Sequence, residues 1–239
     1  MFFYSYLKII IIIIIMYMVL NKLLLLLLCN DYSYKLLQFI LNFKHNELIK
    51  WFFVHSLTNY FIAYYCINDI ILCLNNINTC YLISWNYNSY SAYYLSLLLH
   101  IYHLLFYKVT KTDLIHHLTM CGIAGPLIFY QNSIISSVSL FFMSGLPGMI
   151  DYFILFLVKI GKYDSLKQKQ NYINISIWLR SPGCLLSVYL AIPGLIEYYK
   201  TSLFDFYILL IMAILVFWNG QYYLMKTVND YIIKSTLKV

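Results

Sequence analysis

Long uninterrupted apolar runs are the feature that most constrains what this chain can fold into. Of its 239 residues, 62% are hydrophobic and only 10% are charged, and the apolar residues gather in stretches of about 20. Within a bilayer no water is available to the backbone, so such stretches must form helices that satisfy their own N–H and C=O groups. The sequence shows no series of short alternating strands of the kind that builds a membrane barrel. We therefore expect an all-α, multi-pass membrane protein.

Seven apolar segments predict about seven transmembrane helices. They are Leu7–Leu28, Trp51–Leu74, Tyr90–Tyr107, Leu114–Tyr130, Ile134–Val158, Ile173–Ile196 and Leu203–Met225. The first segment is too long for a cleaved signal and predicts a membrane anchor within residues 1–29. A polar cytosolic linker is expected over residues 30–50, a six-helix transmembrane domain over 51–231, and a short basic cytosolic tail over 232–239.

The distribution of lysines predicts the orientation of these spans. With alternating sides, twelve lysines fall in the first, third and fifth connections and the C-terminal tail, whereas Lys8 and Lys200 fall on the opposite face. Excess positive charge marks the cytosolic side. We therefore expect a lumenal N-terminus and a cytosolic C-terminus. Because the +7 charge is spread over several short loops, it indicates membrane orientation rather than nucleic-acid binding.

The six cysteines do not predict a disulfide framework or a metal site. They form no C-x-x-C pair, and most fall inside apolar segments, where cysteine packs as a small hydrophobic residue. We expect no bound metal and no resident cofactor.

The stretch Lys108–Thr119 carries the densest polar chemistry. Adjacent histidines, His116 and His117, follow Asp113 by three and four residues, so on a helix all three lie near one face. A carboxylate there would fix the tautomer of an imidazole and raise its basicity. The alternative is a simple helix N-terminus, capped by Thr112 or Asp113, with the histidines at the headgroup level.

Each of the second to seventh spans places a polar side chain at a similar depth near the cytosolic edge, at the helical rise of about 1.5 Å per residue. These residues are His55, His100, His103, His116, His117, Asp151, Arg180 and Asn219. A charge exposed to lipid costs about 2.5–3.5 kcal/mol, so they are expected to face inward and line one polar cavity open to the cytosol. Asp69, near the far end of its span, is expected at the interface instead.

Asp151 and Arg180 are natural partners within that cavity. A purely structural ion pair between two helices is the alternative to a functional one. Gly145-Leu146-Pro147-Gly148 and Ser181-Pro182-Gly183 adjoin the two charges. Proline interrupts a helix, and such interruptions are tolerated in membranes beside a cavity. Close packing through small residues is equally compatible with these segments.

These motifs resemble the TLC-domain family, which includes ceramide synthases and translocation-associated membrane proteins. The resemblance runs from about Trp51 to Tyr231. Its most specific part is Asp113–Thr119, which is similar to the family's double-histidine motif. Gly145–Lys159 resembles the Gly-rich helix that follows, and Trp218–Tyr223 resembles the asparagine-aromatic ending of the last helix. The resemblance implies a six-helix barrel around a cavity, preceded by one N-terminal helix.

The resemblance also implies a function and a location. Membrane lipids are the expected partners and the endoplasmic reticulum or a related endomembrane the expected compartment. The His-Asp pair of ceramide synthases is replaced by Pro147 and Gly148, so lipid binding, sensing or metabolism without assigned chemistry is the first hypothesis.

Two further functions stay open. The alternative is an N-acyltransferase with acyl-CoA as cosubstrate, in which His116 or His117 acts as base or acyl acceptor, oriented by Asp113 and assisted by Asp151. A third hypothesis, a proton- or ion-coupled transporter, would use the histidines and Asp151 as a relay.

Overall fold

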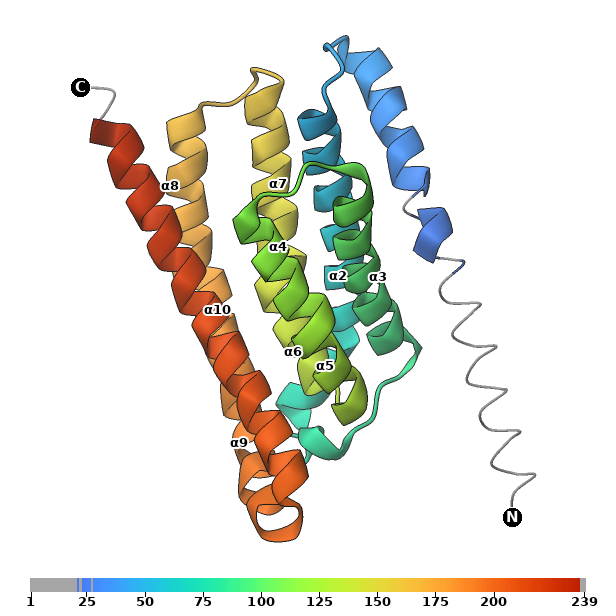
Figure 1. The fold of residues 1–239 in the computed structure, drawn as a ribbon, viewed down its shortest axis with the longest axis vertical. Coiled ribbons are helices and arrows are strands. Elements are labelled where there is room, and N and C mark those ends of the chain that lie inside the picture. Colours follow the sequence, from blue (N-terminus) through green and yellow to red (C-terminus); the bar gives the residue numbers. More distant parts are fainter. Residues whose placement is uncertain (1–20, 22, 27, 237–239) are drawn as a thin grey trace.

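A computed structural model describes residues 21, 23–26 and 28–236 of the chain. Over these residues the regular structure is helical, apart from one isolated bridge between Ser84 and Ser133. Figure 1 shows the helices lying side by side along the long axis of the molecule. Most of the expected anchor Leu7–Leu28, including Lys8 and Lys22, lies outside the described residues.

The described helices form seven rods, three of which are built from consecutive segments. They are the N-terminal helix Leu23–Leu41; α2, Glu47–Asn75; α3, Tyr87–Phe106; α4, Lys111–His117, with η2, Leu118–Ala124, and α5, Gly125–Gln131; α6, Ile135–Leu140, with η3, Phe141–Gly145, and α7, Leu146–Lys159; α8, Ser165–Ile175, with η4, Ser176–Arg180, and α9, Ser181–Thr201; and α10, Leu203–Thr236. A short 3-10 turn, η1, occupies Cys80–Leu82. The rods from α2 to α10 follow the second to seventh expected spans.

Five helices in the described part of the chain are long and apolar enough to cross a membrane. They are Leu23–Leu41, Glu47–Asn75, Ile135–Lys159, Ser165–Thr201 and Leu203–Thr236. The rods at the third and fourth expected spans, α3 and α4 to α5, are not among these five. Both carry polar residues: α3 holds three serines and two histidines, and the rod from α4 to α5 includes Asp113, His116 and His117.

The start of the chain differs from the expectation of a polar linker. Helix continues to Leu41, through the predicted linker, and only residues 42–46 separate it from α2. Its polar residues find partners on α2: Asn30 donates a hydrogen bond to Thr58 over 3.1 Å, and Asp31 pairs with Lys50. These contacts explain how a helix tolerates polar residues in an apolar setting. At the other end, α10 continues to Thr236 through most of the expected tail.

Three of the rods contain a π-helical turn immediately before a proline. η2, η3 and η4 precede Pro126, Pro147 and Pro182, each of which lies in the first turn of the next segment. Proline lacks an N–H and its ring displaces the carbonyl four residues earlier. A wider π turn removes that conflict without ending the rod, and such turns are frequent at functional sites. Pro193 lies inside α9.

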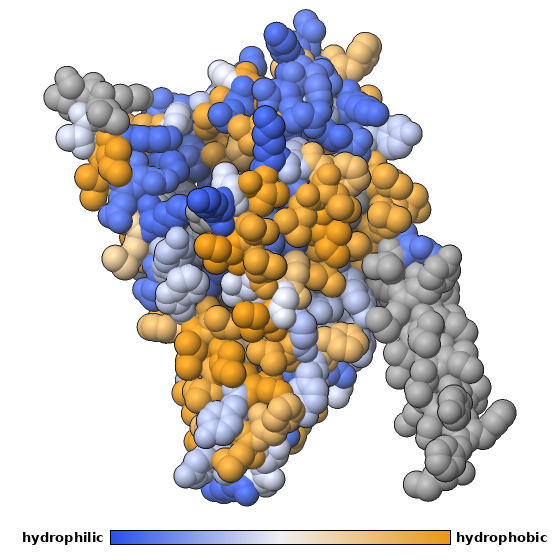
Figure 2. All heavy atoms as spheres, viewed as in Figure 1, coloured by the Kyte–Doolittle hydropathy of each residue, from blue (hydrophilic) through white to orange (hydrophobic). Residues whose placement is uncertain are grey.

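Several polar residues are buried in the bundle beside its apolar core, and many large apolar side chains lie on its surface. Thr58, Asn59 and Asp69 are fully buried, whereas Leu105 and Trp178 are 70% and 80% exposed. Figure 2 shows broad hydrophobic surface over the middle of the visible face and hydrophilic residues gathered toward its upper end. Apolar surface of this extent agrees with the five helices that are long and apolar enough to cross a membrane.

Asp69, expected near the far end of its span and outside the site, lines neither polar cavity. It is completely buried and accepts hydrogen bonds from Asn86 Nδ2 and Ser89 Oγ, both over 2.7 Å. Asn86 and Ser89 also form the capping box of α3. The carboxylate therefore anchors the start of α3 to α2, away from the other predicted site residues.

The six rods from α2 to α10 contact one another in a circuit. α2 packs on α3 and on α6 to α7; α9 packs on α6; α10 packs on α8, α9 and α5. The circuit is completed by side chains between α3 and the fourth rod, where Tyr93 donates to the carbonyl of Gly125. Two glycines permit close approach: a Cβ on Gly148 would meet Asn59, and one on Gly183 would meet the ring of Phe142.

Candidate functional site

A cavity of about 310 Å³ lies between the six rods. Every rod from α2 to α10 contributes to its wall, and the described residues of the N-terminal helix do not. Seven of the predicted site residues line it: His55, His100, Asp113, His116, Asp151, Arg180 and Asn219. Residues from six separate segments therefore meet in one space.

A smaller cavity of about 70 Å³ adjoins the main one and holds the other two predicted residues. His103 and His117 line it, together with His55, His100, Asp113 and His116, which border both spaces. Trp51 forms part of its wall and stacks on the His103 ring, with centroids 4.3 Å apart.

The expected ion pair between Asp151 and Arg180 is not formed. Asp151 instead accepts a hydrogen bond from Gln168 Nε2 over 2.7 Å. Arg180 donates to Tyr172 Oη and to Asn219 Oδ1, each over 2.7 Å, and its guanidinium lies 4.5 Å from the ring centre of Tyr223. Neutral groups thus hold each charge, and both charged side chains still line the cavity. The pair is therefore neither the functional nor the structural ion pair that the sequence predicts.

Asp113 does not orient either neighbouring histidine. Its carboxylate accepts hydrogen bonds from the backbone N–H and the hydroxyl of Thr110, while Thr110 accepts from the Asp113 N–H. This capping box satisfies N–H groups that the first turn of α4 leaves unpaired. The helix N-terminus interpretation is correct for Asp113, but the cap is Thr110 rather than Thr112 or Asp113.

Four histidines form two short contacts across the gap between α3 and α4. His100 Nε2 lies 3.3 Å from His116 Nε2, and His103 Nδ1 lies 2.8 Å from His117 Nε2. His100 and His103 lie three residues apart on α3, so both face α4. His117 is buried among protein side chains, with 5% of its surface exposed.

His55 lies on α2 and lines both cavities, but it is separate from the histidine contacts between α3 and α4. Its ring stacks on Tyr152, with centroids 3.6 Å apart, and its Nδ1 accepts a hydrogen bond from Asn59 over 2.9 Å. The stacking fixes the ring between α2 and α7. His55 therefore helps to shape the cavity wall but takes no part in the histidine contacts between α3 and α4.

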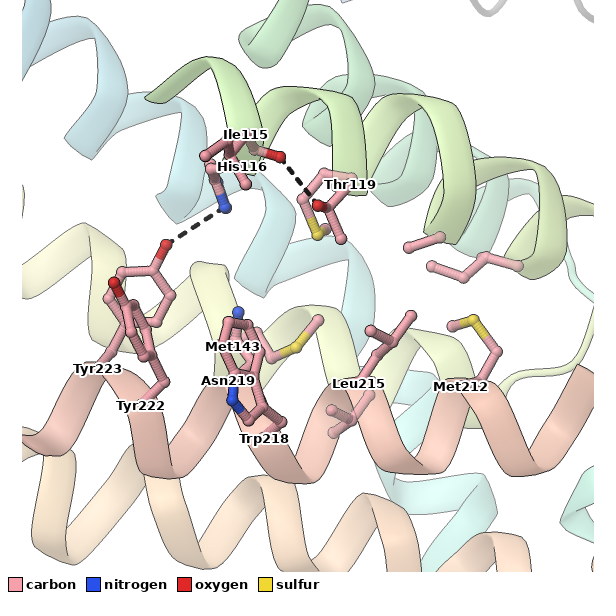
Figure 3. A pocket seen from close by; sticks show the side chains of 14 residues that line it. Ile115, His116, Thr119, Met143, Met212, Leu215, Trp218, Asn219, Tyr222 and Tyr223 are labelled. Carbon is pink, nitrogen blue, oxygen red and sulfur yellow. Dashed lines mark hydrogen bonds between the residues drawn. The ribbon is translucent and has the colours of Figure 1, made fainter. Parts of the chain in front are cut away.

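An apolar pocket of about 210 Å³ lies next to the main cavity, between α10 and the rod from α4 to α5. Figure 3 shows residues of the two rods facing each other across it, with Met212, Leu215 and Trp218 on the α10 side. His116 and Asn219 belong to both spaces. Tyr223 closes the polar end through a 3.2 Å hydrogen bond with His116 Nδ1. The polar cavity and the apolar pocket therefore share wall residues at this end.

Three residues that hold the side chains of the cavity have no counterpart in the sequence prediction. Asn59, Gln168 and Tyr172 hold His55, Asp151 and Arg180 in place. Asn59 follows His55 by one helical turn, a signal that was present in the sequence. Gln168 and Tyr172 lie in α8, a segment that the sequence assigns to a loop, so their depth could not be estimated.

The chain matches no protein-family model, no curated protein and no solved structure.

Proposed function

We propose that the protein is a multi-pass membrane protein that binds a membrane lipid, with the polar headgroup in the main cavity and an acyl chain in the adjoining apolar pocket. The observation that carries this proposal is the junction of the two spaces at His116, Asn219 and Tyr223. A molecule that fills both must be polar at one end and apolar at the other.

The wall of the main cavity favours a headgroup with hydrogen-bonding or anionic groups. Arg180 supplies a charge, and imidazoles, hydroxyls and amides surround it. An acyl chain gains little by leaving lipid for an apolar pocket, because both surroundings are equally apolar. Selectivity must therefore come from the headgroup.

The mouth of the apolar pocket supports exchange with the bilayer. Ile115 and Trp218 line the pocket and are 66% and 53% exposed, so its rim faces the surface that lipid covers. A lipid can then enter sideways without crossing water. This proposal agrees with a divergent TLC-type barrel of six helices preceded by one N-terminal helix, in the endoplasmic reticulum or a related endomembrane.

The experiment is to purify the full chain from membranes and measure bound lipid by mass spectrometry. Leu215→Trp should fill the apolar pocket and reduce the amount of co-purified lipid several-fold. Ile214→Trp is the matched control, because Ile214 is the neighbouring residue on α10 and faces outward, away from the pocket. Equal lipid in the two variants, or no specific lipid in the unaltered protein, would reject the proposal.

An N-acyltransferase is the second candidate, and the position of His116 favours it. The imidazole lies between the main cavity and the apolar pocket. The carbonyl group that joins a headgroup to its acyl chain would lie at the same place. In this reaction His116 Nε2 attacks the thioester carbon of acyl-CoA, the carbon–sulfur bond breaks, and coenzyme A leaves with the proton that the acylated ring releases from Nδ1. An amine then attacks the acyl carbon, the bond to Nε2 breaks, and the proton lost by the amine returns to Nδ1. Asp113 has no orienting role here, since Tyr223 and His100 hold the ring.

Incubation with labelled acyl-CoA and a long-chain base tests this second candidate. Labelled amide should form with the unaltered protein and be lost with His116→Ala. Absence of product, together with a co-purified lipid, supports binding without chemistry.

A further inference from the structure

We propose that His100, His116 and His117 bind a divalent transition-metal ion of the zinc type. One ring nitrogen from each residue lies within 4.8 Å of the others. Neutral imidazole is a common ligand for zinc, copper, iron and nickel, and three histidines with one open position form a known type of catalytic zinc centre. No metal was expected from the cysteine pattern; the histidine trio forms because α3 brings His100 against the His116–His117 pair.

The first two histidines each have one ring nitrogen engaged away from the cluster. His100 Nδ1 donates a hydrogen bond to the carbonyl oxygen of Ser96 over 2.7 Å. A carbonyl only accepts, so Nδ1 carries the proton and Nε2 of the neutral ring presents a lone pair. His116 Nδ1 lies 3.2 Å from the hydroxyl of Tyr223. Outer hydrogen bonds of this kind fix the tautomer and orientation of metal-bound histidines.

His117 provides a second and independent observation. It is only 5% exposed, and its Nδ1 has no hydrogen-bond partner among the described residues. Its Nε2 lies 2.8 Å from His103 Nδ1. If Nε2 donates to His103, the buried Nδ1 of His117 presents a lone pair, and a buried lone pair without a partner is costly. A bound cation would satisfy it.

The distance between the first two ligand atoms fits a tetrahedral metal. A zinc–nitrogen bond of about 2.0–2.1 Å at a tetrahedral angle separates two ligand nitrogens by about 3.3–3.4 Å. His100 Nε2 and His116 Nε2 are 3.3 Å apart. A hydrogen bond between these two rings would explain only their short distance. A metal ion would explain both that distance and the absence of a hydrogen-bond partner for His117 Nδ1 among the described residues.

The fourth ligand of the metal would come from the two cavities that these histidines line. His100 and His116 line the main cavity, and all three histidines line the smaller one. Asp113 borders both spaces and opposes the charge of the cation, whereas Arg180 adds positive charge to the main cavity. This balance favours an anionic fourth ligand, such as hydroxide or an oxygen of a bound headgroup.

The test is metal analysis of the purified full-length protein after chelator treatment and titration with Zn²⁺ or Co²⁺. We expect about one ion per chain, and with Co²⁺ the strong visible absorption of a tetrahedral site. His100→Ala, His116→Ala and His117→Ala should each abolish stoichiometric binding. His103→Ala should weaken binding by about 10–100-fold, because it removes the outer partner of His117.

Two control variants distinguish the loss of a metal ligand from misfolding of the protein. His55→Ala removes a histidine that lines the same cavities but lies outside the trio, and it should retain the metal. His100→Cys replaces the imidazole by a thiolate ligand, so it should still bind Co²⁺ and add a sulfur-to-metal charge-transfer band. Absence of metal from the unaltered protein, or full binding by a His100→Ala/His116→Ala variant, would overturn the proposal.

Lipid analysis of the same samples separates this site from the proposed function. If lipid co-purifies and no metal binds, only the metal proposal fails. If metal binds and Leu215→Trp leaves the lipid unchanged, only the lipid proposal fails. The metal ion and an acyl group would both bond to His116 Nε2. Zn²⁺ should therefore suppress any acyl transfer through that nitrogen.

Discussion

Arg180 donates a hydrogen bond from Nη2 to Oδ1 of Asn219 over 2.7 Å, which joins η4 to α10 inside the bundle. Both side chains are buried and both line the main cavity. The guanidinium has no carboxylate within ion-pairing distance among the described residues, so it depends on neutral acceptors and on the Tyr223 ring.

Asn219→Ala should therefore destabilise the protein. A hydrogen bond to a charged group contributes about 1.5–3 kcal/mol, and its loss leaves the buried charge less solvated. For a chain of this size the expected fall in Tm is about 5 °C. Thermal unfolding in detergent measures it. Asn229→Ala, at an exposed position on the same helix, is the control and should leave Tm within about 1 °C.

Asp69→Ala should cost more than removal of an exposed carboxylate. It would leave Asn86 and Ser89 without their buried acceptor and free the start of α3 from α2, at a cost of about 3 kcal/mol. Asp205→Ala is the comparison, since Asp205 accepts only from the exposed Tyr130 and should cost less than about 1 kcal/mol. Equal unfolding temperatures for the two variants would contradict the structural role of Asp69.

Gly183→Ala should destabilise the packing of α9 against η3. The added methyl would overlap the Phe142 ring, and overpacking costs about 1–3 kcal/mol. Gly122→Ala is a matched control, because nothing lies within 4 Å of its added Cβ. Phe142→Ala should make Gly183→Ala less costly, so the coupling in a double-mutant cycle tests the contact itself.

Cysteines placed in two turns should label from opposite sides of a sealed vesicle. The turn between α7 and α8 holds Lys162, and the turn between α9 and α10 follows Lys200; Figure 1 shows the two turns at opposite ends of the bundle. In the proposed orientation a membrane-impermeant maleimide reaches Lys162→Cys only from the cytosolic side and Lys200→Cys only from the lumenal side. The unaltered chain measures the background. Labelling of both from one side would contradict the topology.

Helix positions were predictable from the sequence because long apolar segments must form helices in a membrane. Residues on different spans could also be placed at a common depth, as His55, Asp151 and Arg180 were. Depth does not fix the direction in which a side chain points. A direct pair between Asp151 and Arg180 was a reasonable inference, yet Gln168 and Asn219 lie closer to them in the folded chain.

The role of Asp113 shows a second limit. Spacings of three and four residues put it on one face with the histidines, but a carboxylate in the first helical turn also has the helix N-terminus to satisfy. The Asp113 carboxylate therefore caps the helix with Thr110 and does not bind a histidine. The contact between His100 and His116 depends on the crossing of two rods, which local spacing does not encode.

The three π-helical turns have a consequence for the length of the chain. Removing one residue from an ordinary α-helix rotates everything beyond it by about 100°. A π turn already holds one residue more than an α turn, so losing Gly122 from η2 would convert that turn to α-helix and leave both flanks facing their present neighbours. Each of these three rods thus holds one residue more than a regular α-helix of the same length, at a position where the chain can shorten without changing the packing of the bundle.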